Sequence, residues 1–277
     1  MKKQNQDWLK EACSLLAEEE TDTVESLMQP DPISAGVLDD EEAVAGALKK
    51  YGFMALPVVD NENRLVGIIT YDDAMDVLEE SSSEDMEMMA AITPTDKPYL
   101  KNTVWETWKN RIPWLLILML SSTFTSKILQ HFEDALVQCA ALTAFIPMLM
   151  GTGGNAGGQV SVTVIRGLSL GEIRMGDVFR ILWKELRVAL LAGGALALVN
   201  FCKMLAFDNV SMLVAAVVSV TVFSVVILAK LVGGLMPILA KRLGCDPAVM
   251  ANPFITTIVD VMSLLVYFGM AKLLLGL

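Results

Sequence analysis

The hydrophobic pattern divides the chain into a mixed front part and a strongly apolar remainder. Beyond residue 111, five apolar stretches approach or exceed the roughly 20 residues that a helix needs to cross a bilayer. They lie near 112–132, 135–165, 182–207, 209–240 and 248–276. Pro147, the glycines after it and Pro237 are expected to kink or locally unwind the longer stretches. The pattern therefore predicts a mostly α-helical membrane protein with five transmembrane helices per protomer.

The front part has the pattern of a small cytoplasmic α/β unit at residues 24–80. Helical spacing over 41–51 is followed by apolar strands at 55–60 and 64–70, a turn at 61–63 and a second helix at 71–80. An acidic, helix-forming segment at 1–23 precedes this unit. A connecting helical region at 81–111 links it to the transmembrane domain at 112–277.

Charge is distributed unevenly between the two parts. The net charge is −16 over residues 1–97 and +5 over residues 98–277, which gives −11 for the chain. Lys and Arg gather before the first apolar stretch and in alternate connections, and such bases are retained on the cytoplasmic side. We therefore expect a multi-pass protein of the cell (inner) membrane, with a cytoplasmic N-terminus and an extracytoplasmic C-terminus.

Composition excludes several functions. The acidic front part is a poor match for a nucleic-acid backbone, which clustered bases would neutralise. His131 is the only histidine, and the four cysteines are widely separated. Zinc sites and Ser-His-Asp or Cys-His catalysis need more than this, so we expect neither nucleic-acid binding nor enzymatic activity.

The fifth apolar stretch carries a stripe of polar residues. They recur at steps of three or four and therefore share one helix face: Asn252, Thr256, Asp260, Ser263 and Tyr267. A carboxylate inside a transmembrane helix costs about 2.5–3.5 kcal/mol on insertion scales. A passing cation would offset this cost, and a protonated, hydrogen-bonded Asp260 is the structural alternative.

The second stretch contains the run Gly-Thr-Gly-Gly-Asn-Ala-Gly-Gly-Gln at 151–159. Although it satisfies a dinucleotide fingerprint, it lacks the strand–helix–strand context that this fingerprint requires. Within a bilayer, the run would bring backbone and amide groups to a water-filled path, with Gly151, Gly153, Gly154, Asn155 and Gln159 lining it together with Ser263. Close helix packing through small residues is the alternative.

Ligand chemistry narrows the choice of cation. Carboxylate, amide and hydroxyl oxygens suit Mg²⁺, Ca²⁺ or Mn²⁺, and hydrated Mg²⁺ needs a wide ring of acceptors. Five passes do not form an internal inverted repeat, so a pathway is most simply built where two copies meet. Two Asp260 carboxylates would then face each other across the axis of a homodimer.

The motifs together resemble two known families. Leu-Pro-Val-Val-Asp at 56–60, with Gly-Ile-Ile-Thr-Tyr-Asp-Asp at 67–73, resembles one CBS motif. That resemblance implies ribose contacts of ATP by Thr70 and Asp73, although both could merely cap the helix. The glycine run, with Asp-Pro-Ala-Val-x-x-Asn-Pro at 246–253, resembles the MgtE family of magnesium channels, here in a short form with one CBS motif.

The MgtE resemblance implies a homodimer with a pore between its subunits. Its pore residues would be Asp260, Asn252 and Thr256, although Thr256 stands where a smaller residue is common. Mg²⁺ would be both the transported ion and the regulator, with Mn²⁺, Co²⁺ or Ca²⁺ as weaker substrates. Cytosolic Mg²⁺ would close the pore by binding acids of the cytoplasmic region, namely Asp72, Asp76, Glu79, Glu80, Glu84 and Asp246. A solvated acidic surface is the alternative reading of these residues.

Two other functions remain open on the sequence. One is a Na⁺- or H⁺-coupled divalent-cation exchanger on the same scaffold. The other is a membrane-anchored CBS-type sensor of Mg²⁺ or nucleotide, whose helices only anchor and dimerise it. Passive, gated flow of hydrated Mg²⁺ into the cytoplasm is the leading hypothesis, because an anchor gains nothing from an ionisable residue at depth.

Overall fold

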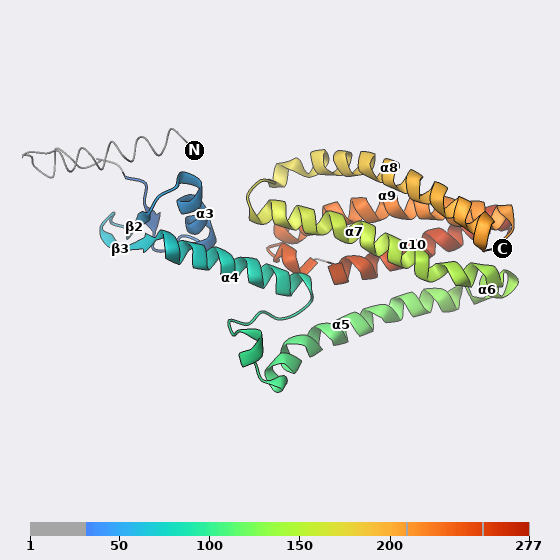
Figure 1. Ribbon diagram of the computed structural model, residues 1–277, viewed down its shortest axis with the longest axis horizontal. Helices are drawn as coiled ribbons and strands as arrows, with labels where there is room; N and C mark the ends of the chain where they lie inside the picture. Colours follow the sequence, from blue (N-terminus) through green and yellow to red (C-terminus); the bar gives the residue numbers. More distant parts are fainter. Residues whose placement is uncertain (1–31, 209, 251, 277) are drawn as a thin grey trace, which may run out of the picture. The chain divides into compact units, whose positions relative to one another are not determined.

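The computed structural model describes residues 32–208, 210–250 and 252–276, and these residues form two units that divide between Leu78 and Glu79. The helix expected at 1–23 lies outside the described residues. The described part is mostly helical and has a small α/β region near its start, as the sequence predicts (Figure 1).

The first unit is built on a three-stranded sheet. Its strands β1 (Ala35–Gly36), β2 (Ala55–Val59) and β3 (Leu65–Thr70) lie in this order, with β1 parallel to β2 and β2 antiparallel to β3. The helix α3 (Glu41–Tyr51) crosses between β1 and β2. The predicted helix and both predicted strands are confirmed to within one residue at each end.

Local sequence explains where α3 begins and ends. The Asp40 carboxylate accepts a hydrogen bond from the backbone amide of Ala43, and Gly52 ends the helix in the left-handed conformation, with φ of 70°. The apolar face of α3 then packs through Leu48 against Leu56 of β2. This small core is completed by the first turn of the next helix.

That next helix, α4 (Tyr71–Met89), is nine residues longer than the sequence analysis predicts. The polar run Ser81 to Asp85 carries no apolar periodicity, which is why a boundary was expected near residue 80. The helix continues because Met88 and Met89, at its far end, pack against Ile165 and Ala248 within the second unit. Tertiary packing therefore decides the length of α4.

The second unit holds the long apolar helices (Figure 1). After the single turn η1 (Tyr99–Lys101) come α5 (Val104–His131), α6 (Glu133–Gln138), η2 (Ala140–Phe145), α7 (Ile146–Ser169), η3 (Met175–Asp177), α8 (Val178–Phe207), α9 (Met212–Arg242), η4 (Pro247–Met250) and α10 (Asn252–Leu275). Among the described residues, four helices are long and apolar enough to cross a membrane: α5, α8, α9 and α10. The 24-residue α7 is long enough, but its glycines and amides lower its hydropathy.

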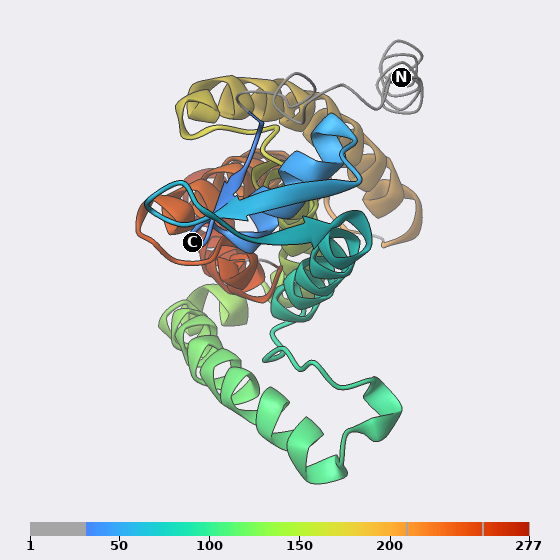
Figure 2. The ribbon, with the colours of Figure 1, turned by 90° about the vertical axis from the view of Figure 1, so that its left-hand side faces the viewer.

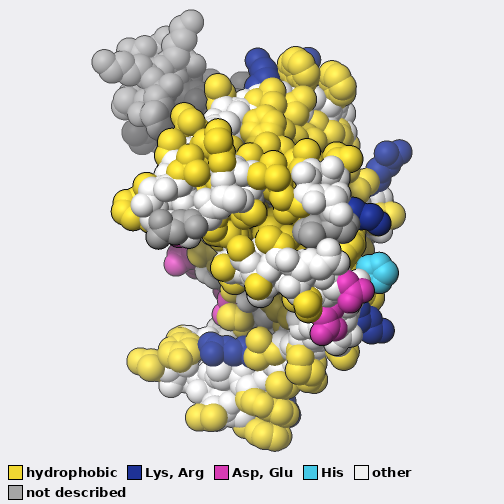
Figure 3. Space-filling view, turned by 90° about the vertical axis from the view of Figure 1, so that its right-hand side faces the viewer, with side chains coloured by type: hydrophobic (Ala, Val, Ile, Leu, Met, Phe, Trp, Pro, Cys, Tyr) yellow, Lys and Arg dark blue, Asp and Glu magenta, His cyan; other side chains and the backbone are white. Residues whose placement is uncertain are grey.

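The helices α7, α9 and α10 surround a common hydrophobic core. It includes Leu149 of α7, Val218 of α9 and Phe268 of α10. The helix α8 packs along α9, whereas α5 lies beside α10 at the edge of the unit and contributes no fully buried residue (Figures 1 and 2). The end of the unit near α6 shows mainly hydrophobic side chains with few bases among them (Figure 3).

Two expectations about the second apolar stretch are wrong. The long helix begins at Ile146 rather than near residue 135, because residues 133–145 form the short elements α6 and η2. The glycine run does not unwind the chain, since α7 is continuous and Pro147 lies in its first turn. Hydropathy alone cannot separate one long helix from short apolar turns leading into it. Pro237 likewise lies inside the continuous helix α9.

Candidate functional site

The glycines of α7 bring neighbouring helices unusually close. A Cβ atom on Gly153 would lie 2.8 Å from a methyl carbon of Val259 and 2.9 Å from the Ser263 oxygen, and one on Gly154 would lie 2.9 Å from a methyl carbon of Thr256. These two glycines are therefore buried where α7 packs on α10. Within this chain, the contacts of Gly153 and Gly154 are those of close helix packing, which the sequence analysis gives as the alternative to a water-filled path.

The opposite face of α7 is polar and exposed. Gly151, Asn155 and Gln159 are all exposed, and they follow one another at four-residue steps. The same face continues through exposed Thr163 and Arg166. The sequence analysis did not place these last two on the polar face, although their helical spacing from Gln159 was a usable signal. Exposed amides on a membrane-length helix require a polar surrounding, either water or protein.

Asp260 lies in the first half of α10 and is only half-buried. Among the described residues, no Lys, Arg or His forms an ion pair with its carboxylate. The residue is therefore neither sealed in the protein interior nor neutralised by a fixed base of the described chain.

The rest of the predicted polar stripe is divided between interior and surface. Ser263 and Tyr267 are buried, and the Tyr267 hydroxyl donates a hydrogen bond of 2.9 Å to the carbonyl oxygen of Leu142. Thr256 is half-buried, and its hydroxyl donates to the carbonyl of Pro253 at 2.9 Å. Asn252 is the first residue of α10, and its side chain lies outside the described set. Ser263 is therefore buried inside a single protomer, where its side chain lies against Gly153.

Lys230 carries a positive charge into the interior of the helical unit, far from either end of its helix. It lies within α9, is buried, and its ammonium group is 3.8 Å from a carboxylate oxygen of Glu185 on α8. The partner of this lysine is therefore Glu185, and the pair joins α8 to α9 well inside the unit.

The predicted regulatory acids lie along α4, apart from Asp246. The exposed members are Asp72, Asp76, Glu79, Glu80 and Glu84. Asp246 precedes η4, and its carboxylate accepts a hydrogen bond of 2.7 Å from the Ala248 amide. In the described parts of the chain, no three or more His, Cys, Asp or Glu side chains are grouped to hold a metal.

The far end of α4 touches the helices that carry the polar residues. Asp85 accepts a hydrogen bond of 3.0 Å from the Ser169 hydroxyl at the end of α7. The apolar contact of Met88 and Met89 with Ile165 and Ala248 lies next to it. The acidic helix is thus in direct contact with α7 and with the segment before α10.

At the start of α4, Thr70 and Asp73 bind each other. The Thr70 hydroxyl donates a hydrogen bond of 2.5 Å to the Asp73 carboxylate. The same hydroxyl is the main cause of a lowered pKa at the exposed Asp72. The bond between Thr70 and Asp73 joins the end of β3 to the first turn of α4.

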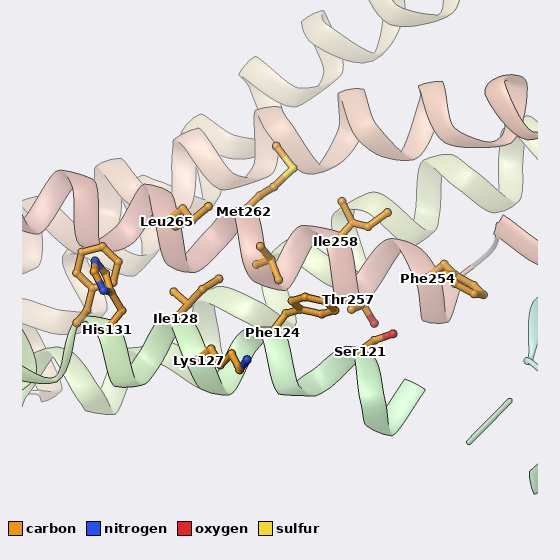
Figure 4. A pocket seen from close by; sticks show the side chains of 12 residues that line it. Ser121, Phe124, Lys127, Ile128, His131, Phe254, Thr257, Ile258, Met262 and Leu265 are labelled. Carbon is orange, nitrogen blue, oxygen red and sulfur yellow. The ribbon is translucent and has the colours of Figure 1, made fainter. Parts of the chain in front are cut away.

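The pocket between α5 and α10 does not include the polar stripe. Its volume is about 550 Å³, and its walls are mostly apolar, with Phe124 and Ile128 facing Ile258 and Met262 (Figure 4). Asp260 is not among the lining residues. Its mostly apolar walls are unsuited to a divalent ion, which takes oxygen ligands.

Comparison with known proteins identifies both units. Residues 146–270 match the MgtE family model, described as a divalent cation transporter, and residues 24–80 match the CBS domain. The chain is 40% identical over 91% of its length to the magnesium transporter MgtE of Thermus thermophilus, and 36% identical over 93% to that of Bacillus subtilis. The corresponding protein of Enterococcus faecalis is 29% identical over 94% of the chain.

The chain spans about half the length of these curated relatives, 56% in each case. The matches cover the α/β unit and the helices α7, α9 and α10, which hold the polar residues described above. Residues 146–270 therefore belong to the MgtE family of divalent cation transporters, and residues 24–80 form a CBS domain.

Proposed function

We propose that two copies of this chain form a gated pore for hydrated Mg²⁺, with Asp260 as its principal cation-binding residue. The observation that carries the proposal is Asp260 itself: a half-buried carboxylate in a membrane-length helix, without a basic partner among the described residues. A divalent ion would neutralise two such groups, one from each copy.

The exposed face of α7 supports a pathway between two copies. Asn155 and Gln159 face away from their own helix bundle, where lipid would leave their amides unsatisfied. A second copy or a water-filled path would meet this need. Thr256, beside Asp260 on α10, and the backbone of Gly151 would add oxygen atoms to the pathway. An inside-negative membrane potential would drive the ion inward.

Uptake into proteoliposomes that contain a Mg²⁺-sensitive dye tests the role of Asp260. We expect Asp260→Ala and Asp260→Asn to lower the initial rate of Mg²⁺ uptake by on the order of tenfold or more, because both variants remove the negative charge that binds the ion. Glu172→Gln, which removes an exposed acid from the loop between α7 and α8, is the matched control and should transport like the parent chain. Equal uptake by all four proteins would contradict the pore assignment. Uptake driven by voltage alone, without a Na⁺ or H⁺ gradient, separates a channel from a coupled exchanger.

Closure by cytosolic Mg²⁺ is the second part of the proposal. Acids on α4 would bind Mg²⁺ between two chains, and the end of α4 would hold α7 and the start of α10 through its contacts with Ser169 and Ala248. Without the ion, the acids repel one another and this contact loosens.

Replacing Asp72, Asp76, Glu79 and Glu80 by Ala should therefore raise flux at high internal Mg²⁺, while leaving flux at low internal Mg²⁺ unchanged. The measurement is dye-reported uptake at a series of internal Mg²⁺ concentrations. Glu133→Ala with Asp134→Ala, on α6, controls for the loss of negative charge as such. An identical dependence on internal Mg²⁺ in the fourfold variant and the parent would refute this form of gating.

A further inference from the structure

The segment before the first membrane helix exposes an unusual set of side chains. Over residues 99–108 the exposed fractions are 71% for Tyr99, 92% for Leu100, 89% for Val104, 61% for Trp105 and 47% for Trp108. The two tryptophan rings stack with centroids 4.6 Å apart. A surface this apolar and aromatic needs a partner other than water.

Bases are interleaved with these apolar residues. Lys101, Lys109 and Arg111 are exposed, and none forms an ion pair among the described residues. The one acid of the segment, Glu106, is already bound by Lys97 at 2.7 Å and by the backbone amide of Thr103 at 2.9 Å. The segment therefore presents three uncompensated positive charges beside its aromatic rings.

A concave site lies between the turn η1 and the start of α5. It measures about 510 Å³, and its walls include Tyr99, Leu100 and Trp108 together with Arg111, Ile112 and Leu115. A guanidinium group binds a phosphate through paired N–H donors. The apolar wall continues past Arg111 along α5, in the direction in which an acyl chain would run.

We propose that residues 99–115 bind anionic phospholipid, with the lipid phosphate at Arg111 and the tryptophans in the headgroup layer. Positive charge favours an anionic headgroup over a zwitterionic one, and aromatic residues at the start of a membrane helix are typical of the interface. The helix rises about 12 Å along its axis from Val104 to Ile112, at 1.5 Å for each of the eight steps between them. This is enough to cross one headgroup layer of roughly 5–8 Å. The proposal goes beyond ion conduction and does not depend on it.

Quenching of tryptophan fluorescence by brominated lipid tests the proposal without any transport assay. The full chain with Trp8, Trp114 and Trp183 replaced by Phe retains only Trp105 and Trp108 as reporters. This protein is placed in phosphatidylcholine vesicles in which a minor share of the lipid is brominated, either as phosphatidylglycerol or as phosphatidylcholine. We expect stronger quenching by the brominated phosphatidylglycerol, and a loss of this preference at high salt.

Charge variants decide whether the named bases carry the preference. Removing one base should weaken the preference for phosphatidylglycerol by up to about fivefold, and K101Q/K109Q/R111Q together should abolish it. The control K241Q/R242Q, at the end of α9, should retain it, as should the charge-conserving K101R/K109R, which leaves Arg111 in place. Equal quenching by the two brominated lipids would overturn the proposal. Weak quenching by both brominated lipids would mean that the surface binds a protein partner instead of lipid. An unchanged preference for phosphatidylglycerol in K101Q/K109Q/R111Q would show that these three bases do not cause it.

Discussion

At the scale of single residues, two glycines allow the backbones of α7 and α9 to approach each other closely. A Cβ atom on Gly233 of α9 would lie 2.3 Å from the carbonyl oxygen of Gly157 on α7. Backbone atoms cannot move aside as a flexible side chain can, so any larger residue must push the two helices apart. The absence of a side chain at Gly233 is therefore what lets α7 and α9 share one core.

Gly233→Ala should destabilise the protein by about 1–3 kcal/mol through overpacking, which lowers the melting temperature by roughly 2–10 °C. Thermal unfolding of the detergent-solubilised chain measures the change. Gly194→Ala on α8 is the matched control, since a Cβ atom there would meet nothing within 4 Å. An unshifted melting temperature in Gly233→Ala would show that the α7–α9 contact is looser than described.

The sequence identified the polar residues, but it did not show which of their side chains point to the surface and which to the interior. The spacing of Asn155, Gln159 and Asp260 marks helix faces, and the structure leaves these residues exposed or half-buried. Ser263 and Tyr267 share the predicted stripe, yet both lie in the interior. Periodicity defines which residues share a face, whereas the neighbour of that face depends on tertiary packing.

At the scale of elements, α8 is joined to α9 by polar groups as well as by apolar packing. The buried Lys230 and the half-buried Glu185 link the two helices, and the Asn200 amide donates a hydrogen bond of 3.2 Å to the Ser219 hydroxyl. A buried charge that loses its partner is strongly destabilising, whereas replacing both charges by apolar residues can be neutral.

We therefore expect Lys230→Met and Glu185→Leu, each alone, to destabilise the fold by about 3–5 kcal/mol. The double variant should recover most of this loss, because no unpaired charge remains. Thermal unfolding of the four proteins gives a double-mutant cycle. Additive losses in the double variant would mean that the two side chains do not interact.

The sequence predicts the boundaries of some elements correctly and misplaces others, and the difference has physical reasons. The strands β2 and β3 and the helix α3 have alternating or helical apolar patterns and clear turn or capping signals, and they are found where expected. The start of α7 and the end of α4 were misplaced. In the first case an apolar stretch holds three successive elements, and in the second a polar stretch continues a helix that packing holds at its far end.

At the scale of the whole molecule, the described membrane unit leaves one polar helix face open. The residues of this face on α7 lie within the stretch that matches the MgtE family model. Composition and hydropathy were enough to indicate a multi-pass membrane protein. They could not indicate which helix faces turn outward, because that depends on contacts between residues far apart in sequence.

The hydrogen bond from Tyr267 to Leu142 has a mechanical consequence for Asp260. It fastens the second half of α10 to the segment that leads into α7, about 10 Å along the helix axis from Asp260. A twist of α10 about its own axis would have to break this bond, at a cost of about 1 kcal/mol. Bending or tilting of the first half of the helix would instead displace the carboxylate and leave the bond intact.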